Sequence, residues 1–177
     1  IKHHVIHPPY LFCKGNVDLL LKIRLSMVVS QAFSENDESL TEGIIQGLKD
    51  IGALPLIPVT NFMCRKLVRH CMNCGIIPVL LLPGGLDGFL LDADNLYADI
   101  LCDVMEADGL LVTVNPPGVK QSKPVVIKTL LHVAGFSPNV ITYYTLSEGQ
   151  SDTMFESAIA NKMQVFVPDN LVRTEER

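Results

Sequence analysis

Aromatic residues are scarce in this chain of 177 residues, and tryptophan is absent. Aromatics make up 6% of the residues, whereas hydrophobic residues together make up 48%. The core must therefore be built mainly from Leu, Ile and Val. Aliphatic cores of that kind suit parallel sheets that are buried on both faces. The length is that of one domain, large enough to bury a substantial core.

An excess of basic residues is also lacking. Fourteen Lys and Arg residues stand against nineteen Asp and Glu residues, which gives a net charge of -5. The cations are scattered along the chain and form no basic stripe. Proteins that bind nucleic acid usually carry a basic patch or stripe. We therefore expect no nucleic-acid partner.

No apolar run reaches the length needed to span a membrane. The longest run, Ile76 to Leu82, contains Pro78 and is followed by Pro83. We therefore expect no membrane partner. No signal peptide is visible, and a chain that begins at Ile1 rather than Met indicates a fragment or a processed form. Five cysteines without the spacing of a disulfide framework indicate reduced thiols, in the cytoplasm or an organelle matrix.

Metal-binding patterns are weak. Three histidines precede Pro8-Pro9 with no cysteine or acidic residue nearby. A single Cys-x-x-Cys pair, Cys71 and Cys74, has no second pair to complete a zinc site. We predict no metal site.

Hydrophobic runs of strand length alternate with segments of helical periodicity. Strands are expected at 23–30, 53–59, 76–82, 109–114, 139–145 and 164–167, with helices between them. This alternation predicts an α/β fold, a three-layer α/β/α sandwich with a mostly parallel central sheet. Residues 1–18 form an irregular N-terminal arm in this interpretation, and residues 19–177 form a single α/β domain.

One stretch combines a strand, a glycine turn and clustered carboxylates. The aliphatic strand 76–82 runs into Gly84-Gly85, and Asp92 and Asp94 follow at the expected start of a helix. Ligands of such folds bind at the carboxyl ends of the strands. Paired glycines let backbone amides approach an anion closely. The same residues are also typical of an ordinary turn and ordinary helix caps.

The motifs of the commonest α/β enzymes are missing. The chain has no phosphate loop, no dinucleotide-binding glycine fingerprint, no nucleophile elbow and no zinc-binding His-Glu-x-x-His helix. Their joint absence excludes the most frequent nucleotide-dependent and hydrolytic classes.

The order of short motifs between residues 74 and 119 resembles the amino acid kinase superfamily. It is most similar to the acetylglutamate kinase and carbamate kinase branches. The matching segments are Gly75-Ile76-Ile77-Pro78-Val79, Asp92-Ala93-Asp94-Asn95, Ala107-Asp108-Gly109-Leu110-Leu111-Val112-Thr113 and Pro117-Gly118-Val119. The resemblance implies transfer of a phosphoryl group from ATP, with Mg²⁺, to a small carboxylate- or carbamate-type metabolite. It also implies a homodimer.

The resemblance further implies a set of site residues. Asp94 falls on the position that organises the catalytic groups. Lys128, or less well Lys123, corresponds to the lysine that neutralises the transferring phosphoryl group. Substrate-binding positions fall on Gly84, Gly85, Asp92 and Asn95, and nucleotide-binding positions fall on Thr113, Asn115 and Gly118.

Two alternatives stay open. The first strand is followed by Gln31-Ala32-Phe33-Ser34 instead of the Lys-x-Gly-Gly loop of the kinases. That departure favours a non-catalytic α/β domain that senses a ligand or forms oligomers. The segment 82–87, Leu-Pro-Gly-Gly-Leu-Asp, is similar to class I glutamine amidotransferase-like hydrolases. Those enzymes need a nucleophilic cysteine at a strand-to-helix turn, whereas Cys102 is expected inside a helix.

Overall fold

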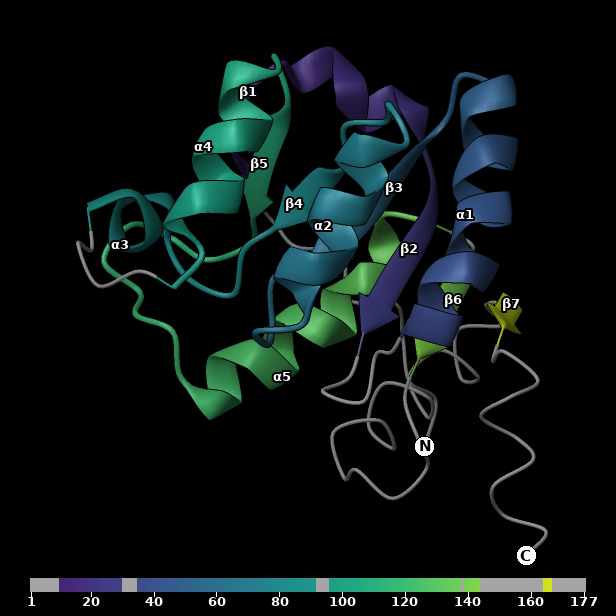
Figure 1. Cartoon of the computed structure of the whole chain (residues 1–177). Coiled ribbons are helices and arrows are strands. Elements are labelled where there is room, and N and C mark those ends of the chain that lie inside the picture. The colour runs from purple at the N-terminus through teal and green to yellow at the C-terminus, as the bar shows by residue number, and fades with distance from the viewer. Residues whose placement is uncertain (1–9, 30–34, 92–95, 138, 144–163, 167–177) are drawn as a thin grey trace, which may run out of the picture.

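A computed structural model of the chain describes residues 10–29, 35–91, 96–137, 139–143 and 164–166 (Figure 1). One seven-stranded sheet organises them, in the spatial order β1-β5-β4-β3-β2-β6-β7. All neighbouring strands are parallel except the β1–β5 pair, which is antiparallel. The strands are β1 (Phe12–Gly15), β2 (Ile23–Val29), β3 (Leu54–Pro58), β4 (Val79–Leu81), β5 (Leu110–Thr113), β6 (Asn139–Tyr143) and β7 (Gln164–Phe166).

Helices cover the two faces of this sheet. In Figure 1 the helices α1, α2 and α4 lie on the viewer's side, and α5 lies behind the sheet. The helices are α1 (Glu35–Asp50), α2 (Cys64–Asn73), α3 (Leu86–Leu91), α4 (Ala98–Glu106) and α5 (Lys123–His132), with short 3₁₀ turns η1 (Val17–Lys22) and η2 (Val133–Gly135). The predicted three-layer α/β/α sandwich with a mostly parallel sheet is confirmed.

The core is divided between the two faces because side chains alternate along each strand. On the face of α1, α2 and α4, the paired residues Ile57, Leu80 and Leu111 form a row across three strands, and all three are fully buried. On the other face, Leu56 and Val79 pack in the cluster that includes Val126 and Leu130 of α5. Strands buried on both faces explain the unbroken aliphatic runs in the sequence.

The amino-terminal part of the sheet differs from the expectation. Residues 12–15 fall in the predicted irregular arm, yet they form β1 and pair with β5. At Gly15 the chain has φ +111, and a side chain there would overlap the carbonyl of Gly109. Residue 18 is therefore not a structural boundary, because η1 spans it. The wider division into an arm and one domain stays a prediction.

Two further differences concern helices. A separate helix α3 occupies Leu86–Leu91, where only the turn after the strand was expected. The helix expected at 151–160 lies outside the described residues. So does the expected start of another helix, at residues 92–95, and the structure describes that helix as α4 from Ala98 onward. No helix in the described parts of the chain is long and apolar enough to cross a membrane.

Candidate functional site

The carboxyl ends of β2, β3, β4 and β5 lie along one edge of the sheet, where α/β proteins bind their ligands. The loops that follow β4 and β5 carry four of the predicted site residues, Gly84, Gly85, Asn115 and Gly118, and Thr113 is the last residue of β5. Asp92, Asp94 and Asn95 lie outside the described residues, so their predicted roles are not tested. Lys128 is exposed on α5, beyond the first turn of that helix.

Gly84 and Gly85 are buried between the loops after β4 and β5. The Gly85 amide donates a hydrogen bond of 2.8 Å to the Val119 carbonyl. A side chain at Gly85 would come within 2.6 Å of the Pro116 carbonyl oxygen. The Gly85 amide is therefore engaged, and the glycine is needed for the close contact of two loops.

Thr113 and Asn115 are buried, with exposed fractions of 0% and 2%. The Thr113 hydroxyl lies 3.0 Å from the Leu82 carbonyl oxygen and 2.7 Å from that of Gly84, and it accepts a hydrogen bond from the Asn115 amide. The Asn115 side-chain amide donates to Thr129 on α5. These residues hold β4, β5 and α5 together and do not face solvent.

Gly118 adopts φ +84 at the exposed tip of the loop after β5. Its amide lies 2.8 and 3.0 Å from the two carboxylate oxygens of Asp87, at the start of α3. A charged acceptor makes this a strong hydrogen bond. The predicted substrate and nucleotide residues that the structure describes therefore form one rigid platform, made of two loops.

A second group of side chains at the same edge was missed by the sequence reasoning. Asn61 lies in the loop between β3 and α2, and its side chain donates to the Val29 carbonyl and accepts from the Met63 amide. Phe62 follows with 56% of its surface exposed, and the Arg65 guanidinium lies over its ring at 4.9 Å. Asn61 thus ties the loop to β2 and fixes the position of the exposed ring.

Electrostatics at this edge are set by two arginines on one face of α2. Arg65 and Arg69 both hydrogen-bond to the Asp99 carboxylate in the first turn of α4. Burial alone would raise the pKa of Asp99, but the two guanidinium groups outweigh it and hold this pKa at about 2. Because two guanidinium cations face one carboxylate, Arg65, Arg69 and Asp99 together carry a net positive charge.

The loop from β5 to α5 reaches Tyr97, the residue that precedes α4. Gln121 hydrogen-bonds the Tyr97 phenol, whose pKa is raised mainly by burial. Lys120 and Lys123 on either side of Gln121 are exposed. We call Phe62, Arg65, Arg69, Lys120 and Lys123 the edge cluster.

Two polar atoms beside the edge cluster have no hydrogen-bond partner among the described residues. They are the Thr60 hydroxyl, just after β3, and Nε of Arg65. Buried donors normally find partners, so these two atoms are exceptions within the described residues. The signal that sequence reasoning missed was a Phe in the loop after a strand, four residues past its end, followed by Arg at i+3 and i+7. The segment lies between the strands expected at 53–59 and 76–82, where only a helix was expected.

No protein-family model and no curated protein matches the sequence. Among solved structures, DNA processing protein A (DprA) from Streptococcus pneumoniae is similar with a TM-score of 0.71 and 24% identity. The match covers 89% of this chain and 54% of that protein, so the chain spans about half its length. DNA processing protein A from Helicobacter pylori, described by its single-stranded DNA binding mode, matches with a TM-score of 0.75 and 16% identity over 96% of this chain and 80% of that one.

At these identities the likeness shows the fold. The resemblance to amino acid kinases is wrong, because the structures that share the fold are DNA processing proteins. The expected phosphoryl transfer is therefore also wrong. The alternative of a ligand-sensing or oligomerising domain is not supported by these structures either. The roles given to ATP and Mg²⁺ depended on that resemblance, and nothing in the structure tests them. Cys102 lies within α4, away from any strand-to-helix turn, so the amidotransferase alternative lacks its nucleophile.

The expectation that nucleic acid is excluded also needs correction, because a protein of the same fold is described as binding single-stranded DNA. The physical reason lies in how charge was judged. A net charge summed over the chain does not reveal four cations brought to one edge by the fold. No group of three or more metal-ligating side chains is arranged to hold a metal among the described residues.

Proposed function

We propose that this chain binds single-stranded DNA along the carboxyl edge of its sheet, with the edge cluster as the contact surface. The observation that carries the proposal is the exposed Phe62 ring with Arg65 over it, in a fold shared with DNA processing protein A. Single-strand-binding surfaces combine aromatic rings, on which bases stack, with cations that follow the backbone.

Each part of the edge cluster has a distinct role in this proposal. Phe62 stacks with an unpaired base on its exposed side. Arg65 and Arg69 keep N–H donors beyond those that bind Asp99, because a guanidinium has five, and these donors reach a phosphate. Lys120 and Lys123 attract the neighbouring phosphates from the loop before α5.

Phe62→Ala tests the stacking role. Loss of one aromatic platform removes about 1–3 kcal/mol of binding free energy, so the Kd for DNA is expected to rise about 5- to 150-fold. The measurement is fluorescence anisotropy at low salt with a labelled single strand of about 16 nucleotides, the upper end of the site size of an OB fold, which also binds single strands. Ile51→Ala is the matched control, because Ile51 is also an exposed apolar residue, at the end of α1.

The wild-type chain should bind the single strand more tightly than the same sequence as a duplex, since a paired base cannot stack on Phe62. Equal DNA affinity of Phe62→Ala and wild type would show that Phe62 does not contact the DNA. Absence of any single-strand binding at low salt would overturn the proposed function.

A further inference from the structure

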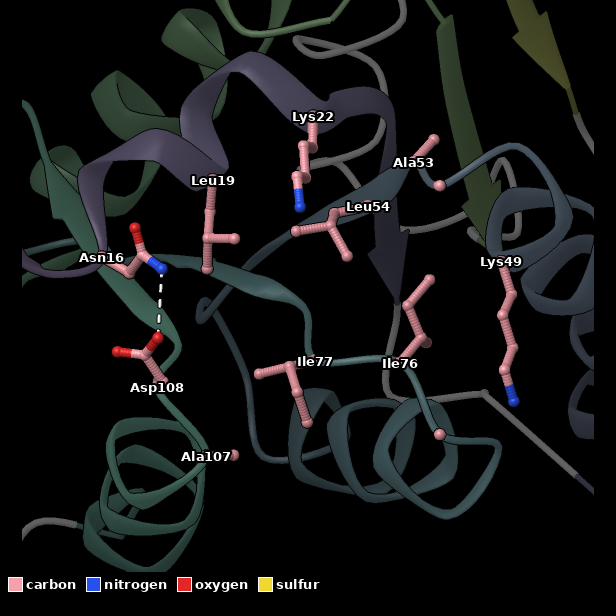
Figure 2. A pocket seen from close by; sticks show the side chains of 12 residues that line it. Asn16, Leu19, Lys22, Lys49, Ala53, Leu54, Ile76, Ile77, Ala107 and Asp108 are labelled. Carbon is pink, nitrogen blue, oxygen red and sulfur yellow. Dashed lines mark hydrogen bonds between the residues drawn. The ribbon is translucent and has the colours of Figure 1, made fainter.

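A cavity of about 430 Å³ opens at the opposite edge of the sheet, where the parallel strands begin (Figure 2). It lies between η1, the ends of α1, α2 and α4, and the start of β3. Its size falls within the range of about 300–1,000 Å³ that is typical of small-molecule sites. The DNA-binding edge does not include it.

The wall of the cavity is mostly aliphatic. Leu19 and Leu54 face its upper part in Figure 2, and Ile76 and Ile77, which lead into β4, form its lower part. Ala53 and Ala107 complete the apolar lining. A surface of this composition takes up an apolar chain and gains free energy by removing it from water.

Lys22 supplies the unbalanced charge of the cavity. It is the last residue of η1, and Figure 2 shows its ammonium directed into the cavity beside Leu54. No described carboxylate pairs with Lys22. Lys22 is exposed, so solvent screens part of its charge, and an anionic group placed beside it is attracted moderately.

Three helices end near this cavity, and helix carboxyl ends carry partial negative charge. That charge is already compensated by capping. The Lys49 ammonium donates to the Cys74 carbonyl at 3.1 Å, beyond the end of α2. At the ends of α1 and α4, the amides of Ala53 and Gly109 bond back to helix carbonyls at 2.8 Å. The charge of Lys22 is therefore not cancelled by these helix ends.

Asp108 is the one acid that lines the cavity, and it lies away from Lys22 in Figure 2. Its carboxylate accepts a hydrogen bond of 3.1 Å from the Asn16 side chain. Its backbone has φ 56, a left-handed conformation that is uncommon for residues other than glycine. The acid is therefore fixed in place and repels an anion from its end of the cavity.

We propose that this cavity binds a small amphipathic carboxylic acid, a molecule with one carboxylate and an aliphatic tail. The carboxylate pairs with Lys22, and the tail lies over Leu54 and Ile77. The repulsion from Asp108 sets this orientation. The site is separate from the edge cluster and does not depend on DNA binding.

Octanoate is the probe for this site, and octanol, which has the same tail without the charge, is the comparison. Titration of the labelled 177-residue chain by NMR should shift methyl signals of Leu19, Leu54 and Ile77. Lys22→Ala should weaken octanoate binding by up to about fivefold, because an ion pair with an exposed lysine is worth up to about 1 kcal/mol. It should leave octanol binding unchanged.

Lys120→Ala is the matched control, because it removes an exposed lysine from the other edge and should not affect octanoate. Ala107→Phe places a ring at the exposed rim of the cavity and should abolish binding of both compounds. Shifts confined to other parts of the chain, or equal octanoate affinity for Lys22→Ala and wild type, would overturn the proposal.

Discussion

Individual residues in this protein take their roles from what they contact. Thr113 and Asn115 have the side chains of a ligand-binding pair, yet both are buried and bond to neighbouring elements. Phe62 has the side chain of a core residue, yet it is exposed. Residue type and spacing do not reveal these differences, because burial depends on long-range contacts that a single sequence does not contain.

The cysteines show the same dependence on environment. Cys64 and Cys71 are buried on the inner face of α2, and burial raises the pKa of each thiol to about 12. Cys102 is exposed on α4. The thiolate is the reactive form, so burial lowers reactivity both through access and through the pKa.

Alkylation by iodoacetamide at about pH 8, just below the ordinary thiol pKa of about 8.5, should therefore modify Cys102 first and leave Cys64 and Cys71 unmodified in the folded protein. Peptide mass spectrometry after timed quenching measures this order. All three should react at similar rates in denaturant, which is the control. Native-state reaction of Cys64 at the rate of Cys102 would contradict the described packing of α2.

At the scale of elements, the loops after β4 and β5 behave as one unit. The bond from Gly85 to Val119 and the bond from Gly118 to Asp87 cross between them in opposite directions. Thr113 adds a third link through the Gly84 carbonyl. The platform under the proposed DNA site is thus fixed by hydrogen bonds between residues about 30 positions apart in the chain.

Gly85→Ala should destabilise the fold, because the added methyl group lies too close to the Pro116 carbonyl and the Asp87 carboxylate. Relief of such an overlap typically costs about 1–3 kcal/mol. Urea denaturation followed by circular dichroism measures the change as a lower midpoint. Gly47→Ala on α1 is the control: no atom lies near its new methyl group, and helix propensity predicts a gain of about 0.5–1 kcal/mol. An unchanged midpoint for Gly85→Ala would show that the two loops can separate without cost.

The elements themselves were largely predictable. Long aliphatic runs identified the parallel strands, and helical periodicity identified α1, α2, α4 and α5, because both signals are local. The strand β1 was missed because Phe12–Gly15 is short and becomes a strand only by pairing with β5. The predicted fold also identified the edge of the sheet where a ligand is expected. It did not identify which side chains are exposed at that edge.

At the scale of the whole molecule, net charge and local charge differ in sign. The chain carries -5 overall, whereas the edge cluster contributes four cations, Arg65, Arg69, Lys120 and Lys123. Charges farther away than the Debye length of about 8 Å are largely screened at physiological salt. A polyanion at this edge therefore responds mainly to the local cations.

Salt should weaken DNA binding only moderately. Neutralising two to four phosphates of a single strand predicts a slope of about -1.4 to -2.8 in a plot of log K against log salt concentration. Titrations at several salt concentrations measure this slope. The double variant Lys120→Ala, Lys123→Ala should make it shallower by about 1.4 if both lysines contact phosphates. An unchanged slope would place the DNA elsewhere.

The antiparallel strand β1 has a consequence for how the chain reaches this structure. Phe12 pairs with Thr113, so about 100 residues separate the two partners. Closing so long a loop is entropically unfavourable until the intervening strands have assembled. We therefore expect β1 to dock late in folding, after β5 has joined the parallel sheet. Until that moment, the free edge of β5 is open to pairing with other chains, and β1 acts as the element that ends this exposure.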